Sequence, residues 1–288
     1  MIAYYRPATL AEALAIRAER DVAILAGGTD IYPARTARLG WGDPAHKDIL
    51  DISAIRGLDR IEETDTAFRF GCLATWTALA EAPLPPLFDG YRRAAREIGG
   101  CQIQNRGTLS GNICTASPAG DGIPNLLALD AQVELTSQSG ARTVAMAAFI
   151  QGYRQTVCRS DEIVTALVVP KLAGARGAFL KLGARKYLVI SIAMVAGVVA
   201  VDEANRIIHA RIAVGACSAV PQRLPALEAA LIGVALEDEP RGVAAVHFTA
   251  LTPIDDIRAS AEYRQAAALA LTRDLLCGLI ATPERRAA

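Results

Sequence analysis

The sequence lacks net charge, a long apolar run and a recognisable export segment. It holds 30 lysines and arginines against 30 aspartates and glutamates, which excludes the basic surface of a protein that binds nucleic acid or an anionic membrane. The longest largely apolar run, residues 187–201, is shorter than the roughly 20 residues of a membrane helix and predicts a buried strand. The first residues, MIAYYRPATL, lack the basic segment and apolar core of a secretory signal, so we expect a cytoplasmic protein.

The sequence also lacks any CxxC pair. Because no export signal is visible, we expect its cysteines to be reduced thiols rather than disulfides. The scatter of the cysteines along the sequence argues against an iron–sulfur or zinc site held by this chain alone. The cysteines are Cys72, Cys101, Cys114, Cys158, Cys217 and Cys277.

Signature motifs of several enzyme classes are missing as well. No GxGxxG follows a predicted strand, and GxxxxGK[ST], HExxH and a GxSxG elbow do not occur, so Rossmann, P-loop, zinc-protease and nucleophilic-serine sites are unsupported. The three histidines, His46, His209 and His247, lie far apart in no motif and are expected to be structural or exposed. We therefore assign no catalytic and no metal-binding residue.

The sequence does contain a glycine-rich stretch from Gly99 to Asp130, which we predict to be a long loop after a helix at 89–98. Pro124 suits the first turn of a short helix, and a strand is expected at 131–136. Uncovered backbone N–H groups suit a diphosphate ligand; alternatively, the stretch is a structural Ω-like loop whose polar side chains bond one another. Asp121 could accept a hydrogen bond from a ligand hydroxyl or ring N–H. The candidate polar side chains are Thr108, Ser110, Asn112, Thr115 and Ser117.

Two smaller features could also contact a ligand. The sequence AGGTD, residues 26–30, follows a predicted strand; its glycines either let the backbone approach a ligand closely or form a tight turn capped by Asp30. Lys181 and Arg185 lie four residues apart at a strand end. They could balance a phosphate or a reduced cofactor, or form a solvated surface pair.

The periodicity predicts an α+β protein. A capping-box pattern at Thr9–Glu12 predicts a helix over 9–20, and a β-α-β unit follows from the segments 21–26, 31–38 and 48–52. The small-residue stretch 172–178 predicts a domain boundary. Beyond it we expect strands at 179–182, 191–201 and 206–216 and helices at 225–232, 240–250 and 259–280.

Taken together, these motifs resemble a known family. The segments AGGTD (26–30) and GCQIQNRGTLSGNICTASPAGDGIPNLLALDA (100–131) are similar to the FAD-binding medium subunits of the molybdenum hydroxylases. These include the flavoprotein subunits of xanthine dehydrogenase and carbon monoxide dehydrogenase. The similarity covers essentially the whole chain, because FLKLGAR (179–185) and SAEYRQ (260–265) resemble the family's C-terminal domain and final helix.

The resemblance implies a fold of three parts. An FAD-binding domain of the vanillyl-alcohol-oxidase (PCMH) type would consist of two α+β subdomains, residues 1–55 and 56–172. A C-terminal domain of β-sheet and helices would comprise residues 173–288.

The resemblance also implies a site for non-covalently bound FAD. The turn at 26–30 would wrap the diphosphate and adenosine side, and the segment from Thr108 to Thr115 would form the second wall. Asp121 would bind the ribityl or adenosine portion, Val164 would touch the adenine region, and Lys181 would lie near the isoalloxazine edge. The expected cofactor-binding residues are Ile24, Leu25, Ala26, Gly27, Gly28, Thr29, Asp30, Ile31, Thr108, Ser110, Gly111, Asn112, Ile113, Cys114, Thr115, Asp121, Val164 and Lys181.

Two departures from the family pattern carry information. Ser110 stands where the family usually has glycine, so its side chain either narrows the approach of the diphosphate or supplies a hydroxyl. The benzoyl-CoA-type relatives carry a loop of cysteines for a 4Fe–4S cluster; this chain has no such cysteine cluster, which disfavours that subgroup.

The implied function is electron transfer within a heterotrimer. A partner with molybdopterin would oxidise the substrate, a partner with 2Fe–2S clusters would pass electrons to FAD on this chain, and FAD would pass them to NAD or another acceptor. One alternative is a stand-alone FAD-dependent oxidase or dehydrogenase of a small molecule. Another is an interaction module that has lost its flavin. No nucleic-acid or membrane partner is expected.

Overall fold

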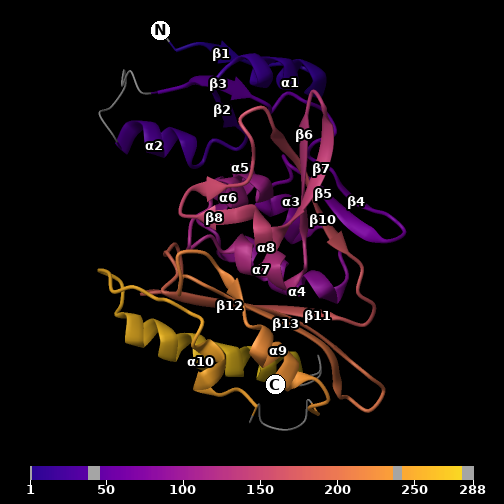
Figure 1. The fold of residues 1–288 in the computed structure, drawn as a ribbon, viewed down its shortest axis with the longest axis vertical. Helices are drawn as coiled ribbons and strands as arrows, with labels where there is room; N and C mark the ends of the chain where they lie inside the picture. Colours follow the sequence, from indigo (N-terminus) through magenta and orange to yellow (C-terminus); the bar gives the residue numbers. More distant parts are fainter. Residues whose placement is uncertain (1, 38–45, 236–241, 281–288) are drawn as a thin grey trace.

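The computed structural model describes residues 2–37, 46–235 and 242–280, which form three main sheets in sequence order and a small two-stranded one. Figure 1 shows the N-terminal sheet at one end of the molecule and the C-terminal sheet, with the long final helix, at the other. Within the described residues, no helix is long and apolar enough to cross a membrane.

The first sheet is parallel, in the order β1 (Tyr4–Tyr5), β3 (Asp48–Asp51), β2 (Val22–Leu25). Parallel neighbours need a crossover connection, and α1 (Leu10–Glu19) and α2 (Ile31–Ala37) follow β1 and β2. The predicted capping box is confirmed: the Glu12 amide donates to Thr9 Oγ1 over 3.3 Å, and the Glu12 carboxylate accepts the Thr9 amide over 3.2 Å. The β-α-β unit is confirmed too.

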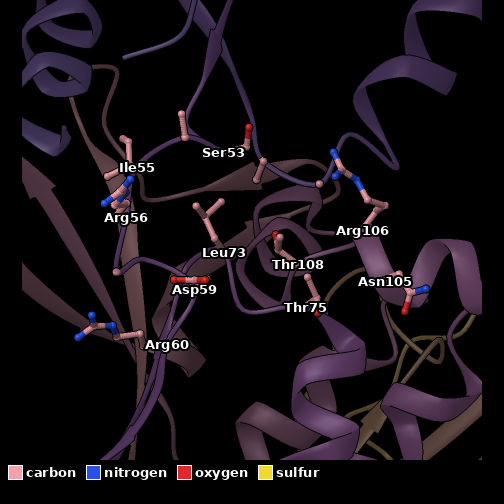
Figure 2. A pocket seen from close by; sticks show the side chains of 14 residues that line it. Ser53, Ile55, Arg56, Asp59, Arg60, Leu73, Thr75, Asn105, Arg106 and Thr108 are labelled. Atoms are coloured by element: carbon pink, nitrogen blue, oxygen red, sulfur yellow. The ribbon is translucent and has the colours of Figure 1, made fainter. Parts of the chain in front are cut away.

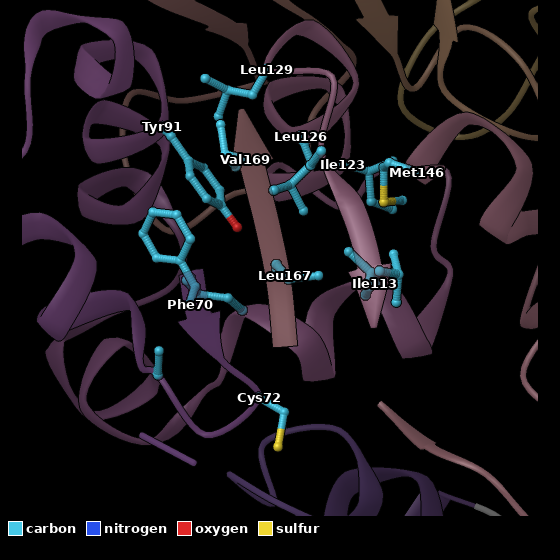
Figure 3. Close-up of a cluster of buried hydrophobic side chains, with 14 of the residues drawn as sticks. Phe70, Cys72, Tyr91, Ile113, Ile123, Leu126, Leu129, Met146, Leu167 and Val169 are labelled. Atoms are coloured by element: carbon cyan, nitrogen blue, oxygen red, sulfur yellow. The ribbon is translucent and has the colours of Figure 1, made fainter. Parts of the chain in front are cut away.

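The second sheet is antiparallel and carries the main core. Its order is β4 (Ile61–Glu63), β5 (Ala67–Gly71), β10 (Ile163–Pro170), β6 (Gln132–Ser137), β7 (Gly140–Ala145). Around it lie α3 (Trp76–Glu81), the 3₁₀ turn η1 (Pro86–Phe88), α4 (Asp89–Glu97) and α8 (Met146–Phe149). Figure 3 shows Phe70, Tyr91, Ile113 and Leu126 gathered about β10. A short hairpin, β8 (Ile150–Gly152) and β9 (Gln155–Thr156), precedes β10.

Most of the glycine-rich stretch is helical, so the prediction of a long loop is wrong, while the short helix expected to begin near Pro124 is confirmed. It forms α5 (Cys101–Arg106), α6 (Leu109–Thr115) and α7 (Gly122–Ala128). Thr108 caps α6 by accepting the Gly111 amide over 3.0 Å, and the helix ends at Ala116 in a left-handed conformation, φ 48°. Helices this short depend on tertiary burial, which Leu109, Ile113 and Leu126 supply, since each is fully buried.

The third sheet is antiparallel, in the order β11 (Arg176–Leu182), β12 (Ala193–Val201), β13 (Ile207–Gly215), β14 (Gln222–Arg223). Helices α4 and α7 contact it from the second sheet's side, while α9 (Pro225–Leu231) and α10 (Ala261–Ile280) pack on it from the other (Figure 1). Because helices cover both faces, β12 is almost wholly buried and reads as a continuous apolar run.

Two predicted elements of the C-terminal third need correction. The apolar run at 187–201 is not one buried strand: only 193–201 is strand, while Tyr187, Leu188 and Ile190 are each about half exposed in the preceding loop. The helix expected at 240–250 is reduced to a 3₁₀ turn, η2 (Ala245–Phe248), since residues 240–241 lie outside the described part and 249–250 are not helical. Hydrophobicity alone does not distinguish a buried strand from an exposed apolar loop.

Candidate functional site

Two adjoining cavities flank the turn after β2. The first, which we call the turn cavity, has a volume of about 510 Å³ and lies between residues 24–34, the segment 98–115 and Arg154. The second, the arginine cavity, has about 490 Å³ and is lined in part by Arg56, Arg60 and Arg106. Figure 2 shows Arg56 and Arg60 on one side of it and Arg106 on the other. Both cavities share Ala26, Gly27 and Thr108, so the turn separates them.

The turn depends on its two glycines. A Cβ at Gly27 would lie 1.9 Å from the Arg106 carbonyl oxygen, so the turn packs backbone to backbone against the end of α5. Gly28 has φ +78°, a left-handed conformation that favours glycine. Among the described residues, the amides of Gly28, Thr29 and Asp30 find no acceptor. Successive free amides at a turn form an anion-binding surface.

Helix α6 forms the facing wall of the turn cavity. Thr108, Gly111, Asn112 and Thr115 line it. The Oδ1 atom of Asn112 is buried and has no hydrogen-bond donor within the described chain. A buried acceptor without a donor is costly, so a ligand hydroxyl or N–H at this point would satisfy it.

The structure brings most of the predicted residues together and leaves others outside. Predicted residues that line the turn cavity are Ile24, Ala26, Gly27, Gly28, Thr29, Asp30, Ile31, Thr108, Gly111, Asn112, Cys114 and Thr115. Leu25 and Ile113 are buried behind the two walls, and Val164 is buried in β10. Ser110 is 3% exposed, lines neither cavity, and its hydroxyl has no partner among the described residues.

Asp121 and Lys181 lie outside both cavity linings, in a closed network of their own. Lys181 Nζ donates to Asp121 Oδ2 over 2.5 Å, and Ser191 Oγ donates to Asp121 Oδ1 over 2.6 Å. Burial raises the pKa of the Asp121 carboxyl, an effect that the Lys181 ammonium and the Ser191 hydroxyl oppose. The predicted partner cation Arg185 turns elsewhere, donating from Nε to the Leu188 carbonyl over 3.2 Å.

Several lining residues were not predicted from the sequence. Trp76, Ile98 and Ile103 contribute apolar surface to the turn cavity. Arg154 lies on its rim and forms an ion pair with Asp30 over 3.3 Å. The two residues are 124 positions apart, and nothing near Arg154 in the sequence marked the hairpin that brings it there.

Comparison with known proteins places this chain in a family. The sequence profile of the FAD binding domain in molybdopterin dehydrogenase matches residues 1–172, and that of the CO dehydrogenase flavoprotein C-terminal domain matches 178–277. The chain is 34% identical to the nicotine 6-hydroxylase medium subunit of Paenarthrobacter nicotinovorans, over 94% of this chain and 95% of that one. It is 32% identical to the nicotinate dehydrogenase FAD-subunit of Eubacterium barkeri, over 82% and 81%.

A solved structure agrees with these matches. The chain superposes on one from carbon monoxide dehydrogenase of Hydrogenophaga pseudoflava with a TM-score of 0.87, at 28% identity over 96% of each chain. The α+β fold and the FAD-binding domain expected from the sequence are thereby confirmed. The chain belongs to the FAD-binding medium subunits of the molybdenum hydroxylases, the oxidoreductase family of the carbon monoxide, nicotinate and xanthine dehydrogenases.

Proposed function

We propose that this chain is the electron-transfer subunit of a molybdenum-containing dehydrogenase, and that it holds FAD non-covalently across the turn cavity and the arginine cavity. The observation that carries the proposal is the turn itself, whose amides at Gly28, Thr29 and Asp30 are free of described acceptors beside a cavity. A diphosphate needs such donors, and it needs glycine where the backbone approaches it closely.

The residues present fit FAD in three respects. The two cavities together offer room for a long dinucleotide that crosses the turn at Gly27. The buried Asn112 Oδ1 lacks a donor in the described chain, and a ribityl hydroxyl could supply one. Trp76, Ile98 and Ile103 offer an apolar surface to a flat ring system. Leu25, Ser110, Ile113, Asp121, Val164 and Lys181 stay predictions as cofactor contacts.

Bound FAD supplies a redox centre that exchanges electrons with a partner's clusters and with a final acceptor. This chain's own residues bind and orient the cofactor. No side chain is assigned a proton-transfer step.

The names of the relatives support a multi-subunit assembly. Those relatives are called an FAD-subunit, a medium subunit and a medium chain. We propose a cytoplasmic heterotrimer with a 2Fe–2S subunit and a molybdopterin-binding subunit, and NAD or another acceptor for the electrons. Within this chain we propose the division 1–55, 56–172 and 173–288, with FAD between the first two parts.

Titration of the purified chain with FAD tests the proposal. We expect quenching of flavin fluorescence with the wild-type chain and loss of binding in Gly27→Ala, whose new methyl group would clash with the Arg106 carbonyl. Gly278→Ala is the matched control, because a Cβ there would meet no atom of the described residues within 4 Å. A folded wild-type chain that neither contains flavin nor takes it up would refute the proposal. Pull-down of iron–sulfur and molybdopterin proteins from the source cells would distinguish the electron-transfer subunit from a stand-alone oxidase.

A further inference from the structure

The turn cavity has one charged pair on its rim. Among the described residues that line it, Arg154 is the only cation and Asp30 the only carboxylate. The guanidinium donates to the carboxylate through two parallel contacts, Nη1 to Oδ2 over 3.3 Å and Nη2 to Oδ1 over 3.4 Å. The pair therefore links the glycine turn to the hairpin of β8 and β9.

The backbone places Arg154 there at a conformational cost. Arg154 forms the turn between β8 and β9 with φ +56°, which few residues other than glycine adopt. Its amide donates to the carbonyl of Ala116 over 3.2 Å, and Ala116 itself has φ +48° at the end of α6. Two neighbouring residues thus hold a sparsely populated conformation, a feature that clusters at ligand sites. Their effect is to fix the hairpin on α6 with the guanidinium facing the turn.

The ion pair between Arg154 and Asp30 is weak, so a ligand could compete with Asp30 for the guanidinium. Both side chains are 48% exposed, and both contacts are long for a charge-assisted hydrogen bond. A carboxylate next to the turn repels an incoming diphosphate, while a guanidinium attracts it and can bind it through two parallel hydrogen bonds. Asp30, as a weak and partly solvated partner, keeps the Arg154 guanidinium in position but can be replaced by a phosphate at little cost.

We propose that Arg154 is a cofactor-binding residue of the turn cavity. In the cofactor-free chain Asp30 holds its guanidinium; when the dinucleotide binds, the guanidinium transfers to a phosphate oxygen, and no covalent bond changes. The inference rests on the proposed function and deepens it, since it assigns the charge that neutralises the diphosphate.

The test compares FAD with riboflavin, which carries the same ring but no phosphate. We expect Arg154→Ala to weaken FAD binding about tenfold or more while riboflavin affinity stays unchanged. Arg154→Lys keeps the charge without the planar fork and should recover part of the loss. Asp30→Asn should tighten FAD binding severalfold, because it removes a repelling charge and releases the guanidinium. Arg176→Ala, at an exposed arginine outside both cavities, is the control.

The two single variants separate ligand binding from a merely structural link between the walls. If the pair only braced the cavity, Arg154→Ala would remove the contact and Asp30→Asn would weaken it, so both variants would weaken FAD binding. That result, or equal losses of FAD and riboflavin affinity, would overturn the inference. Wild-type chain that binds no FAD would refute the proposed function itself, whereas wild-type binding that Arg154→Ala leaves intact would refute the inference alone. Melting temperatures of all variants exclude misfolding as the cause.

Discussion

The turn at 26–30 and the network of Asp121, Lys181 and Ser191 both contain polar and charged groups, but these groups differ in burial and in how many have a hydrogen-bond partner. In the network every charge has a partner, and the side chains of Asp121 and Lys181 are only 5% and 8% exposed. At the turn, amides lack described acceptors and the one ion pair is half exposed. A closed network stabilises the fold, here by joining α7 to the C-terminal sheet, while open donors leave binding capacity for a ligand.

The largest expected effect comes from removing one charge of the closed network. Lys181→Met leaves the Asp121 carboxylate buried without its ammonium, and loss of one partner of a buried ion pair costs about 3–5 kcal/mol. Urea unfolding of the FAD-free chain measures this loss. The double variant Asp121→Asn with Lys181→Met should recover much of it, because no unpaired charge remains. A single variant as stable as wild type would show that the network is solvated and not closed.

A substitution in the facing wall of the turn cavity should lower FAD affinity but not stability. Asn112→Ala removes an acceptor that lacks a described donor, so the free energy of unfolding should change little or rise. FAD affinity should fall about tenfold, the worth of one lost hydrogen bond to the ligand. Fluorescence titration and urea unfolding measure the two quantities, with Gln138→Ala, at an exposed turn, as the control. If the variant loses stability and keeps its FAD affinity, Asn112 stabilises the fold and does not bind the ligand.

Two buried serines give a matched pair for a smaller effect. Ser191 donates to Asp121 over 2.6 Å, whereas the Ser110 hydroxyl has no partner among the described residues. Ser191→Ala should therefore lower the free energy of unfolding by about 1 kcal/mol, and Ser110→Ala should leave it unchanged or raise it. Equal losses would mean that the hydrogen bond of Ser191 contributes nothing beyond packing.

Features set by local sequence could be predicted, whereas features set by tertiary packing could not. Gly27 and Gly28 follow an apolar strand, a local pattern that predicts a tight turn, and the resemblance added the facing wall as an expected part of the site. The helices at 101–106 and 109–115 were missed because glycine favours loops, while burial of Leu109 and Ile113 stabilises the second of them as a helix. Arg154 was missed because tertiary packing, not local sequence, carries it to Asp30.

The smallest expected effect is on the stability that the Asp30–Arg154 pair contributes. An exposed ion pair is worth about 0–1 kcal/mol, and about 1 M salt screens it almost fully. Asp30→Asn should thus change the free energy of unfolding by less than about 0.5 kcal/mol, and the difference should vanish at high salt. The penalty of Lys181→Met should persist there, because buried charges are screened much less. A large, salt-resistant loss of stability in Asp30→Asn would mean that this pair stabilises the fold as the buried network does. The Arg154 guanidinium would then not be available to bind a phosphate of FAD.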